Sequence, residues 1–254
     1  MIKQLAVNML KGLSMSHTSL PIRIFEPRST IQRICDLFTF SSKYLKNAGL
    51  TEDPLERLKL TITFTISSIY MCCDQKKPFN PLLGETAQAI FPDGTRIYCE
   101  HTSHHPPITN FLLEDKDGLY SMHGHFEQCG KMGANSFTSS LRGPCHVTFK
   151  DGHRIRFGFP AYKLGGMVMG ERTIETVGST TFEDITNNRK AVILMSSYKK
   201  TGWIRSTYTG KKDEISGIIY ETYDIQDDLE TVRKNYGKEI QMVEDLSKLK
   251  DVKK

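Results

Sequence analysis

The chain has 254 residues, enough for a substantial buried core, and no composition break, repeat or low-complexity linker divides it, so one domain is expected. Its formal charge of +5 favours an anionic membrane surface or a phosphate ligand but is too small to indicate nucleic-acid binding by itself. Six cysteines without a C-x-x-C pair exclude a zinc ribbon and favour a reduced, intracellular protein. No run reaches the roughly 18 apolar residues of a spanning helix, so membrane contact is expected to be peripheral.

The N-terminal segment, residues 1–16, has apolar side chains at intervals of three and four. These positions are Ile2, Leu5, Ala6, Met9, Leu10 and Leu13. Such spacing predicts a helix with one apolar stripe. Two interpretations stay open on this pattern, a mobile lid or a helix packed permanently on the domain. No small-residue cleavage motif follows, so a secretory signal is not indicated.

Residues 17–84 predict a strand followed by helices. The run from Ser19 to Phe25 is typical of a short strand, and its proline indicates a sheet edge. Ser29 can then cap a helix, with Gln32 completing a capping box. The apolar face of that helix comprises Ile31, Ile34, Leu37 and Phe38.

A second helix is predicted to begin at Asp53, because Pro54 suits the first helical turn and Glu56 the third position. Its apolar stripe comprises Leu55, Leu58, Ile62, Ile66 and Ile69. The segment T-I-T-F-T-I inside it also alternates as a strand does, so the helix and the strand both remain open here.

Residues 85–225 change to short apolar or alternating runs that are separated by turn sequences such as P-D-G and D-K-D-G. We therefore predict a mostly β fold of the α+β type, with a large antiparallel barrel or strongly curled sheet behind the short N-terminal helices. A barrel of more than about eight strands can enclose a ligand cavity. Residues 226–254 are predicted to form a charged, helix-prone tail.

Two motifs can carry chemistry, namely K-K-P-F-N-P-L-L-G-E from Lys76 to Glu85 and E-H-T-S-H-H-P-P from Glu100 to Pro107. Adjacent residues of a regular strand face opposite ways. His104 and His105 can therefore reach one ligand only if the strand ends there, and the two prolines that follow favour such an end. Together with Lys77, the two imidazoles would offer donors to a phosphate without a metal.

The second motif closely resembles E-Q-V-S-H-H-P-P, a hallmark of the oxysterol-binding-protein-related family, and K-P-F-N-P-L-L-G-E resembles that family's upstream hallmark. P-I-R-I-F-E-P-R-S and the run from Tyr162 to Ile219 extend the resemblance over nearly the whole chain. The resemblance implies a barrel with a central lipid tunnel and an N-terminal lid. It further implies a carrier, not an enzyme, which uses no cofactor and exchanges one lipid for phosphatidylinositol 4-phosphate between membranes.

By the same resemblance, His104 and His105 hold the 4-phosphate and Lys77 contacts the phosphate region. Asn80 would lie near that headgroup and would contact phosphatidylserine in members that carry it. The lid would be residues 1–16, with three lipid-facing side chains, Leu5, Met9 and Leu10.

The resemblance also gives candidate tunnel residues. Positions where sterol carriers place polar side chains align with Ile69 and Phe126, and the neighbouring Tyr70 is retained. The second lipid therefore stays open between a sterol, phosphatidylserine and none. A cytoplasmic protein that associates peripherally with anionic membranes, for example at membrane contact sites, is the expected setting.

The family completes its phosphate site with Lys, Glu and Arg at four-residue spacing on a later helix. K-x-x-x-E-x-x-x-R does not occur between Leu229 and Lys254, so we expect either a lipid-binding domain that lacks its C-terminal part or a site that holds the headgroup with fewer cations.

Two other functions compete with lipid transfer. One is a phosphoinositide sensor or scaffold that binds the headgroup without extracting the lipid. The other is a metal hydrolase, because five histidines fall close together in the sequence, namely His101, His104, His105, His123 and His125. Of these, His123 and His125 would share one strand face. No H-E-x-x-H spacing supports the hydrolase.

Overall fold

The computed structural model describes residues 22–73, 76–195, 199–201, 207–209 and 214–222. The predicted lid with Leu5, Met9 and Leu10, and the predicted tail 226–254, lie outside the described residues. Within the described ranges, no helix is both long and apolar enough to cross a membrane.

Helices come first in the described chain and strands follow. The helical elements are the 3₁₀ turn η2 (Ile22–Ile24), α2 (Thr30–Ile34), the 3₁₀ turn η3 (Cys35–Phe38), α3 (Ser41–Leu50), α4 (Pro54–Ser67) and the 3₁₀ turn η4 (Ser68–Cys73). The strands are β1 (Phe25–Ser29), β2 (Lys77–Phe79), β3 (Thr86–Ile90), β4 (Arg96–His104), β5 (Pro107–Glu114), β6 (Tyr120–Met132), β7 (Ser136–Arg142), β8 (Cys145–Phe149), β9 (Arg154–Phe157), β10 (Ala161–Gly165), β11 (Thr173–Asp184), β12 (Arg189–Met195), β13 (Lys199–Thr201), β14 (Thr207–Thr209) and β15 (Ile215–Glu221).

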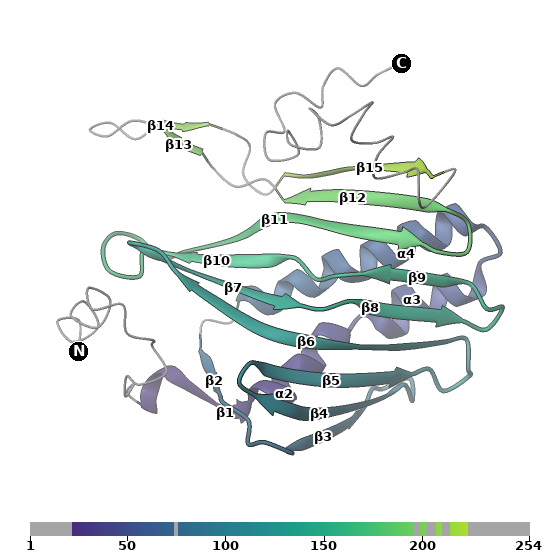
Figure 1. Cartoon of the computed structure of the whole chain (residues 1–254), viewed down its shortest axis with the longest axis horizontal. Helices are drawn as coiled ribbons and strands as arrows, with labels where there is room; N and C mark the ends of the chain where they lie inside the picture. Colours follow the sequence, from purple (N-terminus) through teal and green to yellow (C-terminus); the bar gives the residue numbers. More distant parts are fainter. Residues whose placement is uncertain (1–21, 74–75, 196–198, 202–206, 210–213, 223–254) are drawn as a thin grey trace.

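The main sheet has eleven strands, and every pairing in it is antiparallel. Nine of them follow the order β15-β12-β11-β10-β7-β6-β5-β4-β3, while β8 pairs with β6 and β9, and β9 pairs with β11. The long strands β6 and β11 each pair with two shorter strands, one after the other, along the edge by which they face each other. At one end β7 and β10 lie between them, and at the other end β8 and β9 do (Figure 1). The predicted mostly β fold, with a large antiparallel sheet and few helices on one of its faces, is confirmed.

Gly143 makes the change of partner from β7 to β8 feasible. Its φ of 132° belongs to the region that favours glycine, and a Cβ there would lie 2.2 Å from the carbonyl oxygen of His125. The chain can therefore pass close over β6 only because this residue has no side chain.

The first predicted strand is placed too early. Residues 22–24 form a 3₁₀ turn, and the strand β1 runs from Phe25 to Ser29, where it pairs in parallel with β2. Polar contacts define it: buried Glu26 accepts from Arg33 at 2.7 Å and binds Arg28 at 3.0 Å. Apolar alternation cannot detect a strand held in this way.

The predicted helix starts are confirmed. The backbone N–H of Ser29 donates to the side chain of Gln32 at 3.0 Å, and Asp53 accepts from the N–H of Leu55 at 2.9 Å. The T-I-T-F-T-I segment is helical, and the hydroxyl groups of Thr61 and Thr65 donate to backbone carbonyls one turn earlier. Helix α3, which the sequence analysis did not predict, packs against α4.

The core between the helices and the sheet is largely aromatic. Phe38 lies 4.8 Å from Phe111, which stacks on Phe126 at 4.9 Å (ring centroids). Phe64 of α4 meets Phe159 at 6.3 Å. Edge and offset contacts of this kind hold the helices on the sheet and leave this half of the interior filled.

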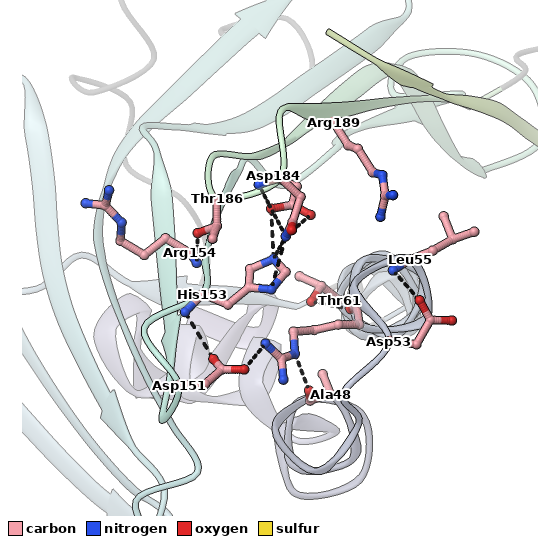
Figure 2. Close-up of polar contacts among 12 residues, drawn as sticks. Ala48, Asp53, Leu55, Thr61, Asp151, His153, Arg154, Asp184, Thr186 and Arg189 are labelled. Carbon is pink, nitrogen blue, oxygen red and sulfur yellow. Dashed lines mark hydrogen bonds and ion pairs between the residues drawn. The ribbon is translucent and has the colours of Figure 1, made fainter. Parts of the chain in front are cut away.

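A buried polar network fastens the two long helices to the sheet (Figure 2). Arg57 donates to the carbonyl of Ala48 at 2.8 Å and to Asp151 at 2.6 Å. Beside it, buried His153 contacts Asp184 at 2.8 Å. The guanidinium of Arg57 therefore satisfies a carbonyl at the end of α3 and also ties α4 to the β8–β9 turn.

Arg57→Ala is expected to lower the free energy of unfolding by about 3 kcal/mol, because it removes a buried donor set and leaves the Ala48 and Thr51 carbonyls without it. Urea unfolding would measure the change. Asp151→Asn is the control and should cost about 1 kcal/mol or less, since that carboxylate is half exposed. Equal losses in the two variants would contradict this account of the network.

Candidate functional site

Two backbone hydrogen bonds join the two sequence motifs. The N–H of Gly84 donates to the carbonyl of His101, and the N–H of His101 donates to the carbonyl of Glu85, both at 2.9 Å. These bonds extend the β3–β4 pairing, in which Thr86 opposes Glu100. The loop that precedes β3 is therefore fixed beside the end of β4, and the prediction that a strand ends at the histidine pair is confirmed.

A bulge in β4 places the histidines on one side. The β4–β5 register shifts between His101 and Ser103, so the regular alternation of faces breaks there. His104 consequently lies on the same side as His101, and their Nε2 and Nδ1 atoms are 3.1 Å apart. Strand β4 ends at His104, a turn takes up the next two residues, and the His104 and His105 rings lie 5.1 Å apart.

His101 is the buried support of this cluster. Its side chain is fully buried, and Nδ1 lies 3.3 Å from the hydroxyl of Thr109, while His104 and His105 are exposed. Burial lowers the pKa of His101 below its ordinary value, the neighbouring His104 lowers it further, and Glu85 acts in the opposite direction. A neutral His101 can hold the ring of His104 in one orientation while the outer two imidazoles face solvent.

Lys77 and Asn80 form a second pair at this end of the molecule. The ammonium of Lys77 donates to the side-chain carbonyl of Asn80 at 2.9 Å and to the carbonyl of Pro78 at 3.1 Å, and it lies 4.9 Å from the ring centroid of Phe25. Burial lowers the pKa of Lys77. An ammonium has three hydrogens, so these two acceptors leave one for a ligand.

The four predicted headgroup residues thus form two separate pairs. Helix α2 contacts β2, which carries Lys77, and also contacts β4, which carries His104. Among the described side chains, no hydrogen bond joins Lys77 to either histidine. A ligand that bridges the two pairs would have to supply that connection itself.

The three candidate tunnel residues have different surroundings. Phe126 is fully buried in the aromatic core, and Ile69 is partly buried against that core. Tyr70 is exposed, and its hydroxyl lies 2.9 Å from that of Thr39. Their role in lining a tunnel stays a prediction.

Strand register identifies an apolar inner wall that the sequence analysis missed. Phe137 opposes Met132 on one side and Leu164 on the other, and Leu164 opposes Ile174. Directly opposed residues share a face, and Leu141, four residues from Phe137, packs on the core, so this row lies on the inner face. All four side chains of the row are half-buried. The alternation of S-F-T-S-S-L-R was the available signal.

Two cavities open elsewhere on the described structure. One, of about 470 Å³, is lined at the opposite end of the strands by Arg96, Lys116 and Lys150 among others, and one of about 380 Å³ lies between α4 and β15. Neither is lined by the predicted site residues.

The histidines considered for a metal site divide between the two faces of the sheet. His101 is buried on the inner face, whereas His123 and His125 lie on the outer face. In the part of the chain that the structure describes, no three His, Cys, Asp or Glu side chains come together as a metal site would require. The metal-hydrolase interpretation therefore gains no support from the geometry.

His101 should make stability depend on pH. The unfolded chain takes up a proton near pH 6.5 and the folded state resists it, so the contribution of His101 is complete above about pH 6.5 and is lost as the pH falls below it. We expect His101→Asn to flatten this part of the profile in urea unfolding between about pH 7.5 and 5, whereas substitution of the exposed His105 by Asn keeps it. An unchanged profile in His101→Asn would refute the assignment.

Comparison with known proteins agrees with this fold and these motifs. The profile of the family "Oxysterol-binding protein" matches residues 4–252. Oxysterol-binding protein 9 of Dictyostelium discoideum is 34% identical over 87% of this chain and 52% of its own length. Oxysterol-binding protein-related protein 3C of Arabidopsis thaliana is 29% identical over 81% of this chain and 43% of its own length. The chain therefore spans about half the length of these relatives.

Two solved structures share the fold. The Osh3 ORD from Saccharomyces cerevisiae in complex with PI(4)P has a TM-score of 0.67 and 27% identity, with 80% of this chain and 54% of that one covered. The Osh1 ORD in complex with ergosterol has a TM-score of 0.65 and 26% identity, with 71% and 44% covered. With its family profile matched over nearly the whole length, this chain belongs to the oxysterol-binding protein family, whose domains bind lipids.

Proposed function

We propose that this chain is a lipid carrier that extracts phosphatidylinositol 4-phosphate from a membrane and exchanges it for a second lipid, a sterol or phosphatidylserine. The observation that carries the proposal is the cluster at the end of β4, where the exposed His104 contacts the buried His101 on one side and the exposed His105 on the other. The PI(4)P complex of Osh3 and the ergosterol complex of Osh1 support the two classes of lipid.

The headgroup contacts follow from the donors present. His104 and His105 would donate to the 4-phosphate through their ring N–H groups. Lys77 would add its third N–H, with Asn80 holding the ammonium in place. This donor set needs neither a metal nor a cofactor, and it binds without a covalent step, so we assign a carrier and not an enzyme.

The acyl chains need a dry space. At about 0.8 kcal/mol per CH₂, a chain of roughly sixteen carbons costs on the order of 13 kcal/mol to hold in water. The half-buried row Met132, Phe137, Leu164 and Ile174 would form one wall of that space, because it continues the inner face beyond the filled aromatic core. Phe126, Ile69 and Tyr70 would lie where this space meets the core and the helices.

One space that accepts two lipids in turn makes their binding mutually exclusive. A difference in phosphoinositide concentration between two membranes can then drive the second lipid against its own gradient. Such a carrier would work from the cytoplasm with peripheral contact to anionic membranes, and membrane contact sites would shorten its path.

His104→Ala combined with His105→Ala should reduce extraction of labelled phosphatidylinositol 4-phosphate from liposomes by about 100-fold, because two charge-assisted hydrogen bonds are lost. Lys77→Ala should reduce it by about tenfold. The matched control is His123→Ala with His125→Ala, two histidines on the outer face, which should extract normally. Unchanged extraction by the His104 and His105 double variant would refute the site. Headgroup binding without extraction by the wild type would instead indicate a sensor.

Deletion of residues 1–16 tests the predicted lid. We expect transfer between liposomes to slow by about tenfold while the midpoint of urea unfolding stays unchanged, since a lid closes over the lipid without forming part of the core. A deletion that lowers the unfolding midpoint strongly would show that the segment is packed on the domain instead.

A further inference from the structure

Two neighbouring leucines project into solvent beside the candidate headgroup site. Leu82 is 76% exposed and Leu83 is 67% exposed, in the loop between β2 and β3. Single exposed apolar residues are ordinary on protein surfaces, but two adjacent leucines at a loop tip form a protruding apolar surface. We call this pair the leucine tip.

The leucine tip is held in place by its own backbone. The N–H of Leu82 donates to the Glu85 carboxylate at 2.8 Å, and the N–H of Glu85 donates to the carbonyl of Leu82 at 3.0 Å. Gly84 has a φ of 78°, which closes this turn, and its N–H donates to His101. Pro81 is buried at the base of the loop. The polar groups of the turn are thus used internally while both leucine side chains face outward.

The position of the leucine tip links it to the headgroup site. The Gly84 and Glu85 bonds to His101 attach it to the strand that ends in His104, and in Figure 1 the start of β3 and the β4–β5 turn lie at the same end of the sheet. Lys77 precedes Leu82 by five residues, and the exposed His104 follows His101 by three. An apolar tip with an ammonium and imidazole donors near it in the chain is complementary to the interface of an anionic bilayer, where phosphates lie just above the acyl chains.

We propose that the leucine tip inserts into the lipid bilayer and brings the His104 and His105 imidazoles to the depth of the headgroup phosphates. The inference rests on the proposed function for the ligand of that site, and it adds the surface by which the protein docks. Insertion places the two leucines at the boundary of the acyl chains. The docked protein then encounters headgroups by diffusion along the membrane surface, so extraction does not require a separate encounter from solution for each lipid.

The test is binding to vesicles of phosphatidylcholine with phosphatidylserine, which contain no phosphoinositide. Leu82→Ser combined with Leu83→Ser should weaken co-sedimentation by about tenfold or more, because the variant no longer buries two leucine side chains in the bilayer. Ile90→Ser is the matched control, since Ile90 is 72% exposed at the far end of β3, and it should bind as the wild type does. Wild-type binding by the double variant, or an equal loss in both variants, would overturn the proposal.

Loss of binding by the double serine variant could also result from misfolding, so a second variant is used that gives a positive signal on insertion. Leu83→Trp should show a blue shift of fluorescence on addition of the same vesicles, after subtraction of the signal of the native Trp203. No shift with bound vesicles would overturn insertion. Sedimentation velocity tests whether a second copy of the chain binds the leucine tip instead of a membrane. If the wild type forms a dimer and the double serine variant does not, the leucine tip is a contact between two copies and the proposal fails.

Soluble inositol 1,4-bisphosphate separates this inference from the proposed function. In calorimetry the leucine variants should bind it as the wild type does, because the imidazoles are intact. Loss of headgroup binding in the leucine variants would overturn a pure docking role. If His104→Ala with His105→Ala still binds the soluble headgroup, the proposed ligand site fails, while the vesicle results still decide the leucine tip.

Discussion

The candidate site depends on the pair of backbone hydrogen bonds at His101. Through them the carbonyl and N–H of one buried residue hold Gly84 and Glu85, and the same residue's imidazole holds His104. The bulge that follows turns His104 to the side of His101, and β4 ends before His105. The position of the loop before β3 and the orientation of the His104 ring therefore both depend on one buried residue.

The interior has two parts with different packing. Next to the helices, aromatic rings fill the space between α4 and the sheet, and Arg57 fastens the helices through buried carbonyls. Beyond the filled part, the inner faces of β7, β10 and β11 present a half-buried apolar row. A rigid core beside a less filled apolar wall suits a protein that must keep its shape while its ligand changes.

Much of the fold could be predicted from the sequence because its signals are local. The capping residues Ser29 and Asp53 indicated the starts of two helices, and turn sequences marked the boundaries between strands of the sheet. The early strand was misplaced because ion pairs of Glu26, not apolar alternation, hold β1. Helix α3 was missed because S-S-K-Y-L-K-N-A-G-L has no capping signal and few apolar positions.

The candidate site could be predicted only in part. Local spacing indicated that His104 and His105 must lie at a strand end, which the structure confirms. The support by His101 required knowledge of the bulge, and the inner wall around Phe137 required the register of four strands, neither of which is written in a local pattern. Exchange of one lipid for another is tested most directly by loading the wild-type protein with labelled sterol or phosphatidylserine and adding liposomes that contain phosphatidylinositol 4-phosphate. We expect release of one labelled lipid for each phosphoinositide bound; uptake of the phosphoinositide with the first lipid still bound would refute exchange.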